Sequence, residues 1–443
     1  MKLVYGIKDK PKFGATIVFA LQQILAILAA TIAVPSIIGN GMSQSAALFG
    51  AGIGTLVYQL LTKFRSPVFL GSSFAFIGSM FAAFGGAASI SAGYAGLIIG
   101  AIFAGLVYVV IAIVVKIAGV KWINKLMPPV VIGPTVAIIG LSLAGNAVGD
   151  CLKFAEKIDG NYVMNTKGWI GLICALVTVF TVILCSVYGK KMAKLIPFII
   201  GICAGYIVAT VFTVIGLKTG NANLTIIDFS LFQNMKWYPD FTFVEALKGV
   251  KEIDAKFIAT VAVAYLPVAF VVFAEHIADH KNLSSIIKKD LLEEPGLHRT
   301  LLGDGVGSMV GAFFGGCPNT TYGESVGCVA ITGNASVVTI TTTAIIAILA
   351  SFFAPFVTLL ATIPACVMGG VCITLYGFIA VSGLKMIQQV DLGENRNVFV
   401  VSIILITGIG GMVLQIGAVT LTAVACSLIL GIITNIVLSK NDK

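Results

Sequence analysis

Charged residues are scarce in this chain of 443 residues. Asp, Glu, Lys and Arg make up 11% of it, whereas 58% of the residues are hydrophobic and the mean hydropathy is +1.03. A soluble domain carries roughly 25% charged residues, so this composition excludes an ordinary water-soluble protein. The first long apolar segment follows Lys8, Lys10 and Lys12 and has no secretory cleavage pattern, so we expect it to be retained in the membrane.

Paired cysteines and clustered histidines are also lacking. The nine cysteines are scattered singly with no CxxC pair, which is typical of small buried apolar residues rather than of a disulfide or metal framework. The three histidines are His276, His280 and His298, and an HxxxH pair without a third ligand is a weak metal signal. We therefore expect no metal and no cofactor. No nucleophile with a base partner is visible in the sequence, so an enzyme is not predicted.

Apolar segments follow one another along the whole chain. A membrane-spanning helix needs about 20 residues, and fourteen segments approach this length, although the third and the tenth are short. This pattern predicts an all-α polytopic membrane protein. The segments cover residues 13–34, 46–62, 68–84, 93–115, 126–148, 168–188, 195–215, 255–276, 298–314, 318–333, 336–360, 363–384, 397–415 and 417–438.

The basic residues are unevenly divided between the two sides of this topology. If both termini are cytoplasmic, the outer loops hold only eight of the 28 Lys and Arg residues, all within 149–167 and 216–256. An excess of basic residues on the cytoplasmic side is the usual pattern, so we expect a multi-pass protein of the cell membrane with both termini cytoplasmic. Contact with anionic lipid headgroups then explains the net charge of +9 without any nucleic acid.

Short motifs recur in the same order in the two halves of the chain. Membrane helices commonly share glycine and other small residues, which can produce one such match, but a series of matches in the same order indicates a duplication. Seven spans in each half would reverse the second half in the membrane, which predicts 7+7 inverted repeats. The matches are Gln22-Gln23-Ile24 with Glu275-His276-Ile277, Gly50–Val57 with Gly303–Val310, Ser72-Ser73-Phe74-Ala75 with Thr320-Thr321-Tyr322-Gly323, and Pro128 and Gly133 with Pro364 and Gly369.

The short segments 68–84 and 318–333 occupy equivalent places in the two halves. The second contains a proline, glycines, small hydroxyl residues and the carboxylate of Glu324, all of which a spanning helix normally avoids. Broken helices at membrane depth are tolerated only where the freed backbone is buried in protein or lines a cavity. We predict a short extended stretch followed by a half-helix in each, and a binding site where the two meet.

Acidic groups at membrane depth are candidates for the chemistry of this site. Glu275 ends an apolar run and Glu324 lies in the second broken segment; a lone carboxylate there costs several kcal/mol unless it is paired, protonated or functional. Asp279 shares a helix face with Glu275, and His280 lies on a neighbouring face. We predict proton exchange at Glu275, Asp279, His280 and Glu324, because acidic groups in a low-dielectric site can change protonation when a substrate arrives.

The start of each half-helix supplies hydrogen-bond donors. Backbone N–H groups near Phe74 and Gly323 have no intrahelical partner and carry the positive end of the helix dipole. Phe74, Tyr322 and Tyr376 add flat aromatic surface. A planar solute with both carbonyl acceptors and N–H donors would suit these groups.

The run from Glu324 to Gly333 resembles the signature of the nucleobase-ascorbate transporter family. With Pro318–Glu324, Gly71–Ile77, Ala274–Ile277 and Lys288–Arg299 it looks most like the uracil permease branch, over the full length of the chain. The resemblance implies a proton-coupled symporter of uracil, a pyrimidine nucleobase, that works by alternating access and is commonly a homodimer.

The resemblance also implies a division of the chain and of the site. A core domain (1–118 with spans 1–4, and 255–360 with spans 8–11) would move against a gate domain (119–254 with spans 5–7, and 361–443 with spans 12–14). Substrate-binding residues carried over by position serve three roles. The side chains of Glu275 and Glu324 would bind the ring edges, the backbone amides of Phe74 and Gly323 would donate to ring oxygens, and Tyr322 and Tyr376 would line the pocket.

Three residues depart from the family pattern and leave alternatives open. Ser325 replaces the signature asparagine, Gln23 stands where the family often has histidine, and Asp279 stands where uracil transporters carry a histidine. Two questions stay open. The chain could be a purine (xanthine or urate) permease of the same family, and transport could be coupled to protons or to sodium. An anion transporter of the same architecture would use the two helix N-termini, but the two acidic residues at the site oppose an anion.

Overall fold

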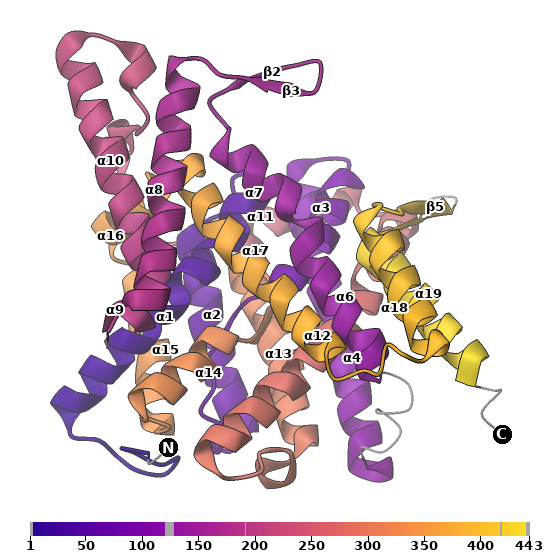
Figure 1. Ribbon diagram of the computed structural model, residues 1–443. Helices are drawn as coiled ribbons and strands as arrows, with labels where there is room; N and C mark the ends of the chain where they lie inside the picture. Colours follow the sequence, from indigo (N-terminus) through magenta and orange to yellow (C-terminus); the bar gives the residue numbers. More distant parts are fainter. Residues whose placement is uncertain (1–2, 120–127, 191, 417–418, 440–443) are drawn as a thin grey trace.

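The computed structural model describes residues 3–119, 128–190, 192–416 and 419–439. Most of them are helical, and the few strands are short (Figure 1). The helices are α1 (Phe13–Ile38), α2 (Gln44–Leu61), α3 (Ile77–Gly85), α4 (Ile90–Ala118), α6 (Pro129–Ser142), α7 (Ala144–Cys151), α8 (Thr166–Tyr188), α9 (Met192–Leu195), α10 (Pro197–Thr219), α11 (Thr242–Gly249), α12 (Ala255–Ile287), α13 (Leu297–Gly315), α14 (Gly323–Thr332), α15 (Val337–Ser351), α16 (Ala354–Ala361), α17 (Ala365–Ile387), α18 (Asn395–Ile409) and α19 (Ala423–Ser439). The strands are β1 (Leu70–Ser72), β2 (Glu156–Ile158), β3 (Asn161–Val163), β4 (Asn319–Thr321), β5 (Leu414–Ile416) and β6 (Val419–Leu421).

Several helices are long and apolar enough to cross a membrane. Among the described residues seven pass this test, namely α1, α4, α6 continued by α7, α8, α10, α12 and α17. The pair α15 and α16, bent by 81° at a short break, forms an eighth candidate. A polytopic, mostly helical protein is therefore confirmed, while the count of fourteen spans stays a prediction. The expected starts of the spans at 126 and 417 lie outside the described residues.

The two short segments are interrupted as predicted. In the first, β1 leads through a 3₁₀ turn at Phe74–Phe76 into α3, and in the second β4 leads directly into α14. The strands pair antiparallel, with Leu70 opposite Thr321 and Ser72 opposite Asn319. Every residue of both strands is buried. Each strand supplies hydrogen-bond partners for the backbone of the other, and unpaired backbone groups would be costly at membrane depth. The pairing also places the starts of the two half-helices next to each other.

Helices α2 and α13 approach closely enough to require glycine. A Cβ atom at Gly54 would lie 2.8 Å from the carbonyl oxygen of Gly307, and one at Gly307 would lie 2.8 Å from the carbonyl oxygen of Gly54. The Asn319 amide of β4 donates to the Gly50 carbonyl oxygen at 2.9 Å. Small residues allow such close helix packing in membranes. The two copies of the repeated glycine motif thus lie against each other beside the strand pair.

Helix α12 continues well past residue 276, where the sequence predicted a span to end. It begins at an N-cap formed by Asp254, whose carboxylate accepts a hydrogen bond from the Phe257 amide at 2.7 Å. It runs on to Ile287, so Glu275, Asp279 and His280 lie within the helix rather than at its end. His276 and His280 are fully buried.

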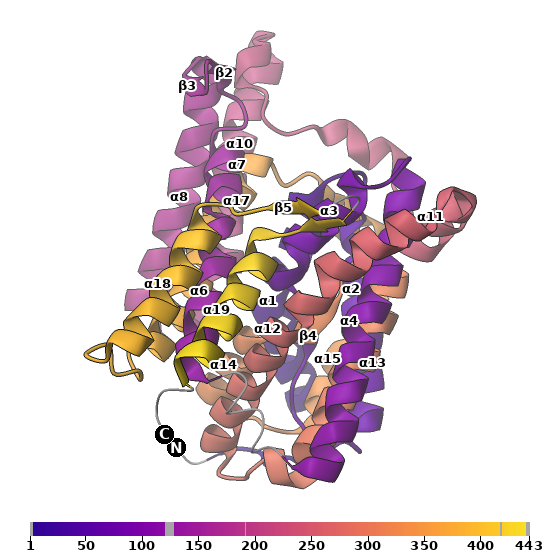
Figure 2. The ribbon, with the colours of Figure 1, turned by 90° about the vertical axis from the view of Figure 1, so that its right-hand side faces the viewer.

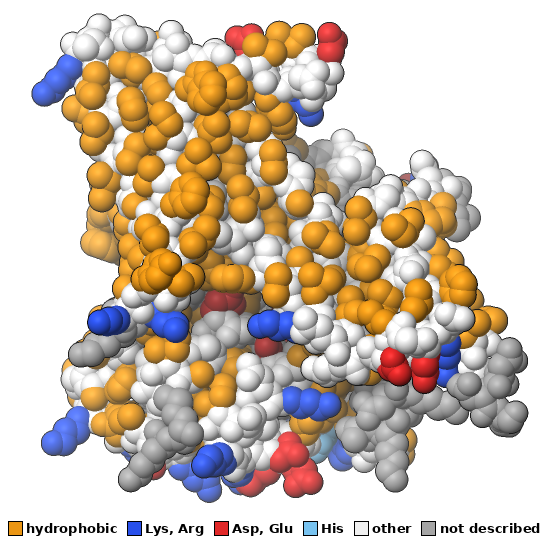
Figure 3. All heavy atoms as spheres, viewed as in Figure 1, with side chains coloured by type: hydrophobic (Ala, Val, Ile, Leu, Met, Phe, Trp, Pro, Cys, Tyr) orange, Lys and Arg blue, Asp and Glu red, His pale blue; other side chains and the backbone are white. Residues whose placement is uncertain are grey.

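The helices form two sets by their contacts. One set comprises α1, α2, α4, α12, α13 and α15, and the other comprises α6, α8, α10, α17, α18 and α19. Figure 2 shows α8, α18 and α19 on one side of the molecule, with α4, α13 and α15 on the other. Hydrophobic side chains cover much of the face in Figure 3, and Lys and Arg side chains gather toward its lower part.

Candidate functional site

A cavity of about 480 Å³ lies between the two helix sets and brings together most of the predicted site residues. Figure 3 shows acidic side chains inside a hollow on this face, with basic side chains near its edge. Apolar lining comes from the second helix set, for example Val136 and Phe378. The predicted residues that line the cavity are Phe74, Glu275, Asp279, Gly323 and Glu324.

Both half-helices begin at this cavity without a side-chain cap. Neither Ser73, before the 3₁₀ turn, nor Tyr322, before α14, caps its helix through its side chain. The first backbone N–H groups of each half-helix therefore need another partner, and the helix dipole makes them good donors to an electronegative atom. Phe74 and Gly323, which carry these amides, both line the cavity.

Three carboxyl groups face the same space from two helices. Glu275 and Asp279 lie one turn apart on α12, and Glu324 lies in the first turn of α14. Asp279 accepts a hydrogen bond from the Thr321 hydroxyl at 2.8 Å. Among the described residues no hydrogen bond or ion pair engages the Glu275 carboxylate. Lys194 of α9 is the one basic residue among the described residues of the lining.

The two predicted tyrosines lie behind the cavity wall rather than in its lining. The ring of Tyr376 lies edge-on to Phe74, with 5.8 Å between centroids. Tyr322 donates through its hydroxyl to the Ser72 carbonyl oxygen at 2.7 Å. Both are buried. In this conformation the tyrosines support Phe74 and the strand pair, and their contact with a substrate stays a prediction.

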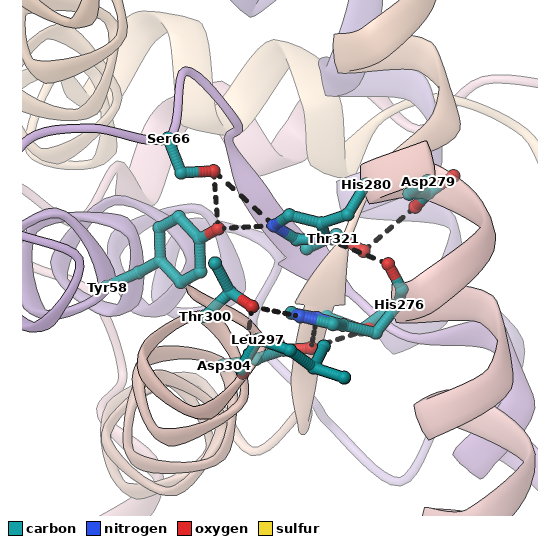
Figure 4. A network of polar contacts seen from close by, with 10 residues as sticks. Tyr58, Ser66, His276, Asp279, His280, Leu297, Thr300, Asp304 and Thr321 are labelled. Atoms are coloured by element: carbon teal, nitrogen blue, oxygen red, sulfur yellow. Dashed lines mark hydrogen bonds and ion pairs between the residues drawn. The ribbon is translucent and has the colours of Figure 1, made fainter. Parts of the chain in front are cut away.

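His280 also lies outside the cavity lining, within a buried network that Figure 4 shows. Its Nδ1 lies 2.8 Å from the His276 carbonyl oxygen, so this nitrogen carries a proton and donates it. Its Nε2 lies 2.8 Å from the Tyr58 hydroxyl. His276 stacks on His280 with 4.0 Å between ring centroids.

The network ends at a carboxylate that the sequence reasoning did not assign to the site. Asp304 of α13 lies 2.7 Å through Oδ2 from Nδ1 of His276. The Thr320 hydroxyl donates to the same oxygen at 3.4 Å. Thr320 and Thr321, neighbours on β4, thus bond to Asp304 behind the strand and to Asp279 at the cavity. The sequence did contain a signal for Asp304, because it is an acidic residue inside an apolar segment, as Glu275 is.

No metal centre is formed by the described residues. Within them no group of three or more His, Cys, Asp and Glu side chains could hold a metal ion.

Half-helices that meet at a cavity between two sets of membrane helices are typical of secondary transporters. Residues 14–417 match the profile of a family described as "Permease family". The chain belongs to this family, so it is a permease rather than an enzyme.

Curated relatives cover almost the whole chain. A uracil permease of Bacillus caldolyticus is 40% identical over 442 residues, which are 99% of this chain and 95% of that protein. A uracil permease of Bacillus subtilis (strain 168) is 36% identical over 443 residues, with coverages of 99% and 96%. The predicted family resemblance is therefore confirmed.

A solved structure supports the fold. The transmembrane domain of a cyanobacterium bicarbonate transporter, BicA, superposes with a TM-score of 0.65. It is 15% identical and covers 97% of this chain and 100% of that domain. At this identity the likeness concerns the fold alone.

Proposed function

We propose that this permease carries a pyrimidine nucleobase, uracil, across the cell membrane together with a proton. The observation that carries the proposal is the meeting of two uncapped half-helix N-termini with the carboxylates of Glu275 and Glu324 in one cavity. Uracil is a flat ring whose edge alternates N–H donors with carbonyl acceptors, so it complements these groups. The names of the two Bacillus relatives support the same substrate.

The predicted substrate-binding residues have different roles in this proposal. Glu275 and Glu324 accept the ring N–H groups, and the backbone amides of Phe74 and Gly323 donate to the ring oxygens. The Phe74 side chain provides apolar surface. Tyr322 and Tyr376 hold the strand pair and the Phe74 ring in place.

The crowding of carboxyl groups supports the proposed proton coupling. Glu275, Asp279 and Glu324 line one cavity at membrane depth, where uncompensated charge is costly. A proton that binds one of them can therefore cross with the substrate. His280 is part of the predicted proton-coupling set, but it contacts Tyr58 and the His276 carbonyl rather than the cavity, so its part would be indirect.

Alternating access is proposed between the two helix sets. The core domain comprises residues 1–118 and 255–360, and the gate domain comprises residues 119–254 and 361–443. The close approach of Gly54 to Gly307 and the pairing of β1 with β4 are consistent with an inverted repeat, which we propose to comprise fourteen spans as 7+7. We also propose that the protein is a homodimer. Both termini would be cytoplasmic, with most basic residues on the cytoplasmic side.

The other readings are less well supported. An anion transporter would share this fold, but three carboxyl groups in the cavity would repel an anion. A purine (xanthine or urate) permease of the same family is the main competitor. The Glu324 carboxylate and the Thr320–Gly323 run favour the uracil branch over the purine members.

Radiolabelled uracil uptake into proteoliposomes tests the proposal. We expect saturable uptake that an inward proton gradient stimulates and that xanthine does not inhibit at equal concentration. Glu275→Gln and Glu324→Gln should each abolish saturable uptake while the protein still inserts, because each removes a negatively charged acceptor. Normal uptake by either variant would refute its binding role, and stronger competition by xanthine would reverse the substrate assignment.

A further inference from the structure

Two buried polar side chains next to the cavity take no part in the proposed chemistry. Gln23 of α1 is 3% exposed and Ser325 of α14 is fully buried. The side-chain amide of Gln23 donates to the Ser325 hydroxyl oxygen. The same oxygen accepts the backbone N–H of Phe69 at 3.1 Å. Buried polar groups are costly unless they are hydrogen-bonded, so these contacts join α1, the residue before β1 and the first turn of α14.

The position of Phe69 shows why the Ser325 hydroxyl is needed. The ladder between β1 and β4 begins with Leu70 opposite Thr321, so the amide of Phe69 lies one residue beyond it. On the other strand the facing residue is Tyr322, the N-cap of α14, whose carbonyl oxygen accepts the backbone N–H of Val326 at 3.2 Å. The hydroxyl of Ser325 replaces the missing backbone acceptor and attaches the half-helix to the strand.

The cluster of Gln23, Ser325 and the Phe69 amide lies directly behind the cavity wall. Ser325 follows Glu324 in the chain. Ala26 and Cys328 lie one helical turn beyond Gln23 and Ser325, respectively, and both line the cavity. A shift at this cluster would therefore move the wall that carries the Glu324 carboxylate.

We propose that Gln23 is a positioning residue for Glu324, acting through Ser325. The amide of Gln23 and the N–H of Phe69 hold the Ser325 hydroxyl between them, which sets the direction of the first turn of α14 and of the carboxylate it carries. This inference rests on the proposed nucleobase transport, because Glu324 is the group whose alignment it explains.

The sizes of the two side chains make them a matched pair. A long amide on α1 reaches a short hydroxyl on α14 in space that is closed to solvent. Asparagine at 325 alone would overfill this space, and histidine at 23 alone would displace the donor. Gln23 and Ser325, which both depart from the family pattern, therefore compensate each other and count as one change.

Uptake kinetics of four variants test the pair. Gln23→Ala should raise the KM for uracil about tenfold, as expected for loss of one buried hydrogen bond, while the amount in the membrane and the maximal rate stay within about twofold. Gln23→His and Ser325→Asn should each impair uptake. The double variant Gln23→His with Ser325→Asn should recover most of the loss, which a merely additive structural defect would not do.

A second Gln–Ser pair in the same chain provides the control. The Gln44 amide donates to the Ser36 hydroxyl oxygen at 2.7 Å, and neither residue lines the cavity. Gln44→Ala should leave the KM unchanged. If Gln23→Ala does not accumulate, Ser325→Ala is measured instead; it deletes the one oxygen atom that accepts both the Gln23 amide and the Phe69 N–H, and it should also raise the KM.

The outcomes separate this inference from the proposed function. A wild-type KM in Gln23→Ala or in Ser325→Ala, or a double variant whose loss equals the product of the single losses, would overturn the positioning role while uracil transport stands. A wild-type protein without saturable uracil uptake would overturn the proposed function and this inference with it.

Discussion

At the scale of single residues, the structure separates groups that face the cavity from groups that hold it in shape. Glu275 keeps its carboxylate available to the cavity, whereas the Tyr322 hydroxyl is engaged by the Ser72 carbonyl oxygen. Asp279 does both, because it lines the cavity and also accepts a hydrogen bond from Thr321. The partners of these residues in the folded structure distinguish the roles. A substitution at a facing group should change transport, and one at a holding group should change stability.

Tyr322→Phe is a direct test of a holding group. The change removes the hydroxyl that donates to the Ser72 carbonyl oxygen at 2.7 Å, and we expect a loss of about 1 kcal/mol in stability. The measurement is the midpoint of thermal unfolding of the purified protein in detergent. Tyr188→Phe is the matched control, because Tyr188 is 75% exposed, and equal midpoints for the two variants would contradict the assignment.

A pH test applies to Glu294, in the loop that joins α12 to α13. Its carboxylate lies 2.8 Å from the Lys289 ammonium and 2.6 Å from the Arg65 guanidinium. The hydrogen bond and charge of Lys289, and then the charge of Arg65, lower the pKa of Glu294 from its usual 4.5. A lowered pKa in the folded state means that the stabilisation is present above the unfolded pKa and is lost as pH falls through the lowered value.

The expected outcome is a stability difference that disappears in acid. Glu294→Gln should lower the unfolding midpoint slightly at pH 7, since exposed ion pairs contribute little, and should match the wild type once the pH is well below 4.5. The measurement is thermal unfolding of both proteins over this pH range at low salt. A difference that grows toward acid pH would have the wrong sign for this pair.

At the scale of elements, the half-helices depend on a strand pair and on close helix packing. The pairing of β1 with β4 satisfies backbone groups that would otherwise be orphaned at membrane depth. The pair is held in turn by Asn319, which reaches the backbone of α2 where α2 and α13 meet through glycine. Packing between these two helices therefore supports the start of both half-helices.

Gly50→Ala should be severely destabilising. A Cβ atom at this position would overlap the backbone carbonyl oxygen of Gly311, and backbone cannot move aside as a flexible side chain can. We expect a loss of at least about 2 kcal/mol or failure to accumulate in the membrane. Gly377→Ala on α17 is the control, because a Cβ atom there meets nothing within 4 Å. Comparable accumulation and unfolding midpoints for both variants would contradict the packing argument.

At the scale of the whole molecule, the cavity lies where the two helix sets meet, and a small apolar contact lies within its lining. Leu195 of α9 packs against Ala26 of α1 and Cys328 of α14. All three line the cavity. Under the proposed alternating access, this contact must open and close in each cycle.

A cross-link at this contact should stop transport. In Leu195→Cys the new thiol lies next to the native Cys328, so mild oxidation should join them and reduce substrate uptake to background. A reductant should restore it. The measurement is uptake before and after oxidation, with Leu195→Cys in a Cys328→Ser background as the control that cannot cross-link. Full uptake by the cross-linked protein would show that the two sets need not separate here.

The sequence by itself determined the membrane setting, the two interrupted segments and the carboxylates of Glu275 and Glu324. Each of these follows from local composition, because a polar or helix-breaking residue inside an apolar run is visible without knowing what lies next to it in space. Tertiary structure alone decided that Gln23 meets Ser325, that His276 meets Asp304, and that Tyr376 lies behind Phe74. The partners belong to different helices or strands, and side-chain periodicity tells which face of an element is buried but not which residue of another element meets it there.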